Sequence, residues 1–123
     1  GFCGTDDADD KVWSKSVLQH CIRPDHGYTY DSQQIKWLID MLHGFPKEKR
    51  RRFLQFCTGS PRLPVGGFKG LSPPLTVVKK TASFVGNENE LPSAMTCYNY
   101  LKIPPYESYN TFLDRFEVAL QHV

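Results

Sequence analysis

The sequence has little that points to metal, disulfide or nucleotide chemistry. Its four cysteines lie far apart, without the paired spacing of a zinc site or the density of a disulfide scaffold. It has no HExxH sequence, no GxSxG elbow and no glycine-rich loop with the lysine that binds phosphate. No metal and no cofactor are therefore predicted. The cysteines are expected to be free thiols in a reducing compartment, although their even number leaves two disulfides open.

An excess of one charge and long hydrophobic runs are also missing. The 15 basic and 13 acidic residues give a net charge of +2, which is too balanced for a dedicated nucleic-acid binder. No apolar run approaches the length that crosses a membrane, and the first residues lack the features of a signal peptide. With 123 residues, the chain suits one ordinary globular domain. We expect a cytoplasmic or nuclear protein without nucleic-acid or membrane partners.

Three helices are predicted, over residues 32–44, 46–59 and 108–123, because apolar residues recur there every three or four positions. The first two end at a glycine, and all three begin at residues suited to a helix N-terminus. These N-terminal residues are Asp31 or Ser32, Pro46 and Ser108. The apolar stripes comprise Ile35, Leu38, Ile39, Leu42, Phe53, Leu54, Cys57, Phe112, Leu113, Phe116, Ala119 and Leu120.

The second helix also carries a run of basic residues in its first turns: Lys47, Lys49, Arg50, Arg51 and Arg52. The helix macrodipole favours acidic residues at this end, so stabilisation of the helix does not explain the basic run. The preferred interpretation is a solvated helix face, with a docking patch for an acidic partner as the alternative.

Two strands are predicted. Residues 75–81 are rich in β-branched side chains, and residues 98–103 are followed by two prolines. Residues 60–74 contain so many prolines and glycines that a loop is expected there. The expected fold class is α+β, an α/β-type sandwich in which helices pack on a small sheet.

The N-terminal residues give weaker signals. Residues 5–10 hold four acidic residues and no large apolar side chain, so they are expected to be exposed and mobile. Residues 11–24 contain apolar residues without a sustained period, and an extended connector and an interrupted helix both remain open.

Among the cysteines, Cys97 differs in its position. Cys57 falls on an apolar helix stripe, where a thiol behaves as a small hydrophobic group. Cys3 and Cys21 lie in irregular segments and are treated as incidental. Cys97 follows a proline-led loop and precedes the strand predicted at 98–103, a junction that can present a side chain to solvent. This context alone favours a half-buried structural cysteine over a reactive one.

Two segments in the same order resemble one family. Residues 91–104, LPSAMTCYNYLKIP, resemble the L-P-x-x-x-T-C-x-N-x-L-x-L-P sequence around the active cysteine of HECT-type ubiquitin ligases. Residues 53–64, FLQFCTGSPRLP, resemble the F-L-x-F-x-T-G-[ST]-x-R-x-P segment of the same family. Residues 59–68, GSPRLPVGGF, together with Met95-Thr96-Cys97, are most similar to the branch of large HECT ligases that extend ubiquitin-fusion degradation signals.

The resemblance extends towards the N-terminus and implies a domain organisation. Gly27-Tyr28 and the later Ile35-Lys36-Trp37 resemble the start of the family's C-terminal lobe. Cys3-Gly4 and Trp13 resemble the end of its N-terminal lobe and the hinge. The expected division is therefore the end of the N-terminal lobe and hinge linker in residues 1–22, and the C-terminal lobe with the active cysteine in residues 23–123.

The resemblance also implies a function and a site. Cys97 is expected to accept ubiquitin from a conjugating enzyme as a glycyl thioester and to pass it to a substrate lysine. Thr96, Asn99 and Leu101 are expected to position the thioester or the ubiquitin tail. Thr96 and Asn99 could equally satisfy the loop backbone, and Leu101 could be core. The strand from Tyr98 could also pair through its main chain with an extended ubiquitin tail.

Two departures from the family pattern bear on activity. Met95 stands where many members have histidine, so no side chain adjacent to Cys97 can act as a base. Residues 121–123 are expected to lie short of the usual family terminus. The expected partners are ubiquitin, a protein substrate and a conjugating enzyme recruited through the N-terminal lobe, without which the fragment is not expected to be fully active. The alternative is a non-catalytic ubiquitin- or protein-interaction module that keeps the fold.

Overall fold

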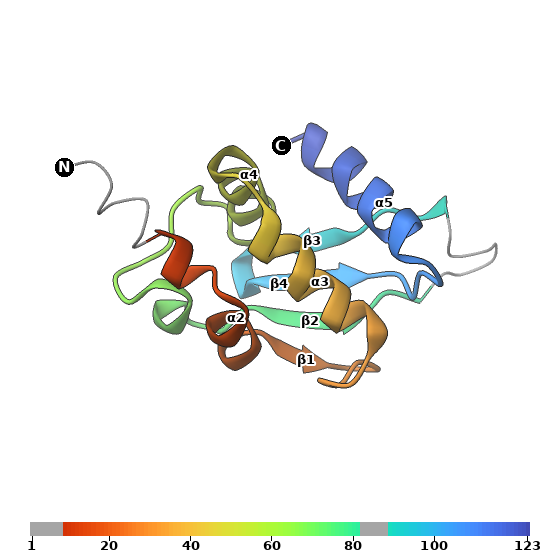
Figure 1. Cartoon of the computed structure of the whole chain (residues 1–123), viewed down its shortest axis with the longest axis horizontal. Helices are drawn as coiled ribbons and strands as arrows, with labels where there is room; N and C mark the ends of the chain where they lie inside the picture. Colours follow the sequence, from red (N-terminus) through yellow and green to blue (C-terminus); the bar gives the residue numbers. More distant parts are fainter. Residues whose placement is uncertain (1–8, 82–88) are drawn as a thin grey trace.

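The computed structural model describes residues 9–81 and 89–123 (Figure 1). The predictions for Cys3, for Cys3-Gly4 and for residues 5–8 of the acidic run lie outside the described residues. The elements are α2 (Lys15–Cys21), β1 (Arg23–Asp25), α3 (Gln33–Gly44), α4 (Lys47–Thr58), the 3₁₀ helix η1 (Gly67–Gly70), β2 (Thr76–Lys79), β3 (Ser93–Met95), the 3₁₀ turn η3 (Thr96–Tyr98), β4 (Tyr100–Ile103) and α5 (Tyr109–Gln121). Within these ranges, no helix has the length and apolarity needed to cross a bilayer.

A four-stranded mixed sheet lies at the centre of the fold, in the order β1-β2-β4-β3. Strands β1, β2 and β4 are parallel, whereas β3 runs antiparallel to β4. The predicted α+β class is confirmed. Strands β1 and β3 were not predicted, because three residues are too few to show a period and their pairing partners are distant in sequence.

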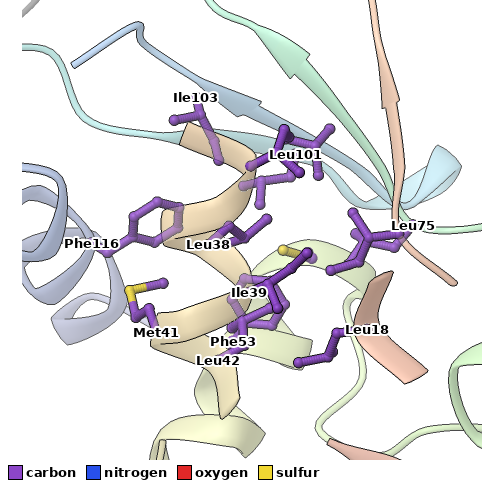
Figure 2. Packing of buried hydrophobic residues seen from close by; sticks show 14 of the residues in the cluster. Leu18, Leu38, Ile39, Met41, Leu42, Phe53, Leu75, Leu101, Ile103 and Phe116 are labelled. Carbon is purple, nitrogen blue, oxygen red and sulfur yellow. The ribbon is translucent and has the colours of Figure 1, made fainter. Parts of the chain in front are cut away.

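The helices α3, α4 and α5 gather on one side of the sheet (Figure 1). Their apolar stripes and the inward side chains of the strands form one buried cluster. Figure 2 shows Leu38 of α3, Leu101 of β4 and Phe116 of α5 meeting in this cluster. The three predicted helices are confirmed, and their stripes are buried as the spacing requires, except that Leu113 is half-buried.

The ends of α4 and α5 follow the predicted chemistry. Pro46 precedes α4, and Gly59 ends it in the left-handed conformation, at φ 84°, with its N–H donating to the Gln55 carbonyl at 3.0 Å. Ser108 caps α5, because its hydroxyl oxygen accepts a hydrogen bond from the N–H of Thr111 at 3.1 Å. The position of the Cys97 site depends on where α4 ends.

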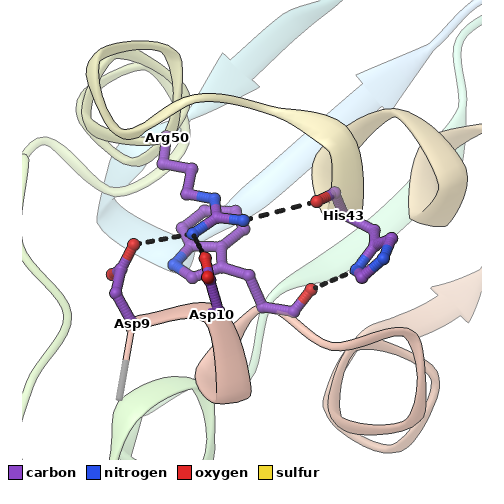
Figure 3. Close-up of polar contacts among 5 residues, drawn as sticks. Asp9, Asp10, His43 and Arg50 are labelled. Carbon is purple, nitrogen blue, oxygen red and sulfur yellow. Dashed lines mark hydrogen bonds and ion pairs between the residues drawn. The ribbon is translucent and has the colours of Figure 1, made fainter. Parts of the chain in front are cut away.

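The prediction that the basic run of α4 is a solvated face is wrong for Arg50, which is only 7% exposed. Its Nη1 lies 2.6 Å from Asp9 Oδ2 and 3.1 Å from Asp10 Oδ1, and its Nη2 donates to the carbonyl of His43 at 3.3 Å (Figure 3). The guanidinium carbon lies 5.3 Å from the centre of the Trp13 ring, in cation–π contact.

Arg50 is buried because of its place on the helix. It precedes Phe53 and Leu54 by three and four residues, so it shares their inward face. The two acidic partners and the ring compensate the loss of hydration. Arg51 and Arg52 point away from this face and are exposed, as predicted.

The open interpretation of residues 11–24 is resolved as helix and strand. After a helical stretch at residues 9–12, α2 begins at an N-cap formed by Ser14, and β1 follows it directly. Trp13, Leu18 and Ile22 all belong to the buried cluster. The division of the chain at residue 22 stays a prediction.

Candidate active site

Cys97 is the central residue of the turn η3, which joins β3 to β4. Its side chain is exposed, as predicted. The predicted strand start is wrong by two residues, because Tyr98 belongs to the turn and β4 begins at Tyr100. Cys97 therefore sits at the tip of a tight connection between two antiparallel strands.

Asn99 makes this turn possible. It adopts the left-handed conformation, at φ 52° and ψ 45°, which asparagine tolerates better than most residues. Its backbone N–H donates to the Thr96 carbonyl at 3.3 Å, and its side-chain Nδ2 donates to the Pro73 carbonyl at 2.7 Å. Its own carbonyl accepts from the N–H of Thr76 at 3.0 Å. The turn is thus anchored to the segment that leads into β2.

The end of α4 supports the turn from another direction. A Cβ atom placed on Gly59 would lie 3.6 Å from the Cβ of Thr96, so the helix end lies close to the turn. Thr96 itself is exposed. The segment 53–64 and the segment 91–104, recognised separately in sequence, therefore meet at Cys97.

The predicted site residues fall into two groups. Cys97 and Thr96 are exposed together on the turn, whereas Asn99 is 7% exposed and uses its amide to bind the Pro73 carbonyl. Leu101 is fully buried in the cluster, which is the core alternative left open in sequence. The roles of Thr96 and Asn99 towards a thioester stay predictions.

The prediction that a ubiquitin tail could add to the strand from Tyr98 is corrected by the sheet order. Strand β4 pairs with β2 on one side and with β3 on the other, so both of its main-chain edges are occupied. Among the described strands, β3 pairs only with β4. The edge beside Cys97 that lacks a second strand is therefore residues 93–95.

The other described cysteines lie in different surroundings. Cys57 is fully buried on α4, as predicted, and burial raises the pKa of its thiol well above the usual range. Cys21 is half-buried, and all three described cysteines are free thiols. Within residues 9–81 and 89–123, Cys97 is the only exposed cysteine.

The immediate neighbours of Cys97 are apolar and exposed. Met95 and Tyr98 flank the cysteine and are 44% and 57% exposed. No described side chain hydrogen-bonds the Cys97 thiol. The described side chains therefore do not activate this thiol through a direct hydrogen bond in their present arrangement.

Sequence reasoning missed two parts of this site. The Pro73 carbonyl anchors Asn99 across 26 positions of sequence, and no local pattern signals such a bond. The strand β3 could have been suspected only from the alternation of Ser93, Ala94 and Met95 after a proline, which is a weak signal at this length.

The thiols of Cys97 and Cys57 should differ sharply in their rate of labelling by maleimide. At pH about 7.5, we expect maleimide to modify Cys97 at least roughly 100-fold faster than Cys57, because Cys57 reacts only after local opening of the core. The raised pKa of Cys57 keeps its thiol protonated near pH 9, so alkalinity should not by itself activate it. Peptide mapping by mass spectrometry resolves each cysteine. Equal rates for the two residues would contradict the burial of Cys57.

Comparison with known proteins agrees with the segments at the site. A family model described as "HECT-domain (ubiquitin-transferase)" matches residues 2–123. The chain is 51% identical over 108 residues to E3 ubiquitin-protein ligase TRIP12 of Danio rerio, covering 87% of this chain and 5% of that protein. It is 47% identical over 110 residues to Ubiquitin fusion degradation protein 4 of Saccharomyces cerevisiae, covering 89% and 7%. The chain spans less than a tenth of the length of either relative.

Proposed function

The chain belongs to the HECT-domain family of ubiquitin transferases, and on this premise we propose that Cys97 carries ubiquitin as a glycyl thioester. The observation that supports this most directly is the exposure of Cys97 at the tip of an anchored turn, while Cys57 is buried and Cys21 is half-buried. A covalent carrier must be reachable by two large proteins in succession. Of these three thiols, Cys97 meets that requirement best.

The proposed reaction consists of two acyl transfers. The Cys97 thiolate attacks the thioester carbonyl of a charged conjugating enzyme, a new C–S bond forms, and the enzyme's own thiolate leaves. A substrate lysine then attacks the new thioester, an isopeptide bond forms, and the Cys97 thiolate leaves as the amine loses a proton. Cysteine suits both steps because its thiolate is a good nucleophile and a good leaving group.

The surroundings of Cys97 suggest how the carrier state is oriented. The edge of β3 that pairs with no described strand runs directly into the turn and could receive an extended ubiquitin tail by main-chain hydrogen bonding. The exposed hydroxyl of Thr96 could donate to the thioester carbonyl. Asn99 acts indirectly in this proposal, because its side-chain hydrogen bond to the Pro73 carbonyl holds the turn in place.

The remaining parts of the proposal concern the larger protein. We infer that residues 1–22 lead from an N-terminal lobe that recruits the conjugating enzyme and supplies the missing base. The printed name of the yeast relative refers to ubiquitin fusion degradation, and the proposed setting of this chain is the same pathway class, in the cytoplasm or nucleus.

The test is a loading assay with this chain in one polypeptide with a HECT N-terminal lobe. With charged conjugating enzyme, we expect an adduct of one ubiquitin that disappears on treatment with reductant and does not form with Cys97→Ala. Cys21→Ala is the matched control and should load normally. An adduct that persists in Cys97→Ala, or no adduct with the intact enzyme, would refute the carrier role. The second result would favour a non-catalytic interaction module.

A further inference from the structure

Two charged runs that are distant in sequence meet in the structure. Asp9 and Asp10 end the acidic run near the N-terminus, and Arg50 belongs to the basic run at the start of α4. Arg50 Nη1 lies 2.6 Å from Asp9 Oδ2 and 3.1 Å from Asp10 Oδ1 (Figure 3). The first turn of α4 is an unfavourable place for a cation on helix grounds alone, because the macrodipole is positive there. The two carboxylates, and not the helix, therefore explain why a cation occupies this position.

Residues 9–14, which we call the entry segment, are held on the rest of the chain at further points. Trp13 is 1% exposed, and its ring centre lies 4.9 Å from that of Phe68 in η1, in edge-to-face contact. The Trp13 carbonyl lies 3.1 Å from Nδ1 of His43, in the last turn of α3. Arg50 also donates from Nη2 to the His43 carbonyl at 3.3 Å (Figure 3). One guanidinium thus joins the entry segment to α4 and to the end of α3.

This polar clamp, formed by Arg50, Asp9 and Asp10, can be opened without removing a core side chain. The side chains of Asp9 and Asp10 are 35% and 71% exposed, whereas Trp13 belongs to the buried cluster. Substitution of the two aspartates therefore releases the clamp and leaves the apolar anchor in place.

Helix α4 connects the clamp to the turn that carries Cys97. Arg50 lies in its first turn, and Gly59, which ends it, is close to Thr96. The 12 residues of the helix span roughly 18 Å at the usual rise of about 1.5 Å per residue. Because a packed helix of this length is stiff, the direction in which the entry segment leaves α4 sets the direction in which Cys97 faces.

We propose that Arg50 is a positioning residue for the loading of Cys97, because it clamps the entry segment and so fixes how Cys97 faces the conjugating enzyme. The inference rests on the proposed function, in which residues 1–22 lead from the lobe that recruits that enzyme. A recruited enzyme presents its thioester in one place, and the rate of acyl transfer depends on the orientation of the attacking thiol. A released entry segment allows many orientations of Cys97, most of which are unproductive.

The experiment compares two ubiquitin donors, with this chain in one polypeptide with a HECT N-terminal lobe. One donor is the charged conjugating enzyme, which depends on the N-terminal lobe. The other is ubiquitin activated as a thioester of mercaptoethanesulfonate, which reaches Cys97 directly from solution. We expect Arg50→Gln to slow loading from the enzyme about tenfold and to leave loading from the small thioester within about twofold, because only the first reaction depends on orientation between lobes. Adducts are quantified on gels run without reductant.

Variants on the other side of the clamp locate the effect. Asp9→Asn combined with Asp10→Asn should slow loading from the conjugating enzyme by a similar factor. Adding Arg50→Gln to that pair should cause no further slowing, because the same contact has already been lost. Arg52→Gln is the matched control, since Arg52 is exposed on the same helix and pairs with Glu48 at 3.3 Å. It should load at the wild-type rate from both donors.

Folding is checked first by circular dichroism and urea denaturation, and rates are compared at a temperature at which each variant is fully folded. If Arg50→Gln does not fold, the variant with both aspartates replaced carries the same test, because those side chains are partly or largely exposed.

Several outcomes would overturn the proposal. Equal slowing with both donors would mean that Arg50 supports the turn itself and not the orientation of Cys97. Unchanged or faster loading from the conjugating enzyme would exclude the clamp as a positioning contact, and additive effects of the two sets of variants would mean that they act separately. Failure of the unmodified protein to load from either donor would instead refute the carrier role of Cys97, and with it this inference.

Discussion

Replacing Cys97 by serine is expected to leave an adduct that forms slowly and cannot be resolved. Serine is a weak nucleophile unless a base removes its proton, and no described side chain hydrogen-bonds the Cys97 position. If an ester forms, its alkoxide is a much poorer leaving group than a thiolate when an amine attacks. The overall rate of ligation should therefore fall roughly a thousandfold or more.

The thioester of the wild type and the ester of Cys97→Ser can be distinguished on one gel. The wild-type adduct should be cleaved by reductant, whereas the Cys97→Ser adduct should resist reductant and be cleaved only by alkali. Cys21→Ser is a suitable control, since it makes the same change at a half-buried thiol and should leave both steps intact. Turnover by Cys97→Ser at a rate within tenfold of the wild type would mean that another group carries the ubiquitin.

Replacing Asn99 by alanine should have the largest effect on stability of any change at the turn. The left-handed conformation costs alanine about 1 kcal/mol more than asparagine or glycine. Loss of the amide also removes its part-buried hydrogen bond to the Pro73 carbonyl, at about 0.5–1.5 kcal/mol, since exposed Pro73 can bind water instead. Together we expect the free energy of unfolding to fall by about 1.5–2.5 kcal/mol, measured by urea denaturation.

Two further variants at Asn99 separate these causes. Asn99→Gly removes the amide but accepts the left-handed backbone, so its free energy of unfolding should fall by about 0.5–1.5 kcal/mol, the hydrogen-bond part alone. Asn99→Asp keeps the shape, but its carboxylate cannot donate to the Pro73 carbonyl and should be at least as destabilising as glycine. If all three variants unfold at the same urea concentration as the wild type, the turn does not depend on this contact.

The loading assay distinguishes support of the turn from contact with the thioester. If Asn99 acts only by holding the turn, loading should fall in proportion to the loss of folded protein and recover when stability is restored by lower temperature. A defect in the second transfer that persists in fully folded Asn99→Gly would instead indicate direct contact with the reacting group.

The helices could be predicted from sequence because each is specified by residues that lie close together along the chain. Apolar residues recur four positions apart, such as Leu38 and Leu42 on α3 and Phe53 and Cys57 on α4. The residues that begin or end the helices, Pro46, Gly59 and Ser108, are adjacent to them in sequence. The spacing of the apolar residues therefore predicts directly which side of each helix is buried.

Cys97 was recognisable as the candidate active cysteine for a different reason. Its local context alone favoured a structural role, and only the resemblance of segments 53–64 and 91–104 to one family distinguished Cys97 from Cys57. The structure adds the physical link between those segments, because it places Gly59, at the end of α4, close to Thr96.

The short strands, the partner of Asn99 and the burial of Arg50 were decided by tertiary structure. Each depends on groups that are distant in sequence: β3 on β4, Asn99 on the Pro73 carbonyl, and Arg50 on Asp9. The sequence by itself determined which residues form helices and which cysteine belongs to a family motif, since both depend on residues that are close together along the chain. Which edges are free and which charges face one another depends on long-range pairing, and that is a property of the folded chain alone.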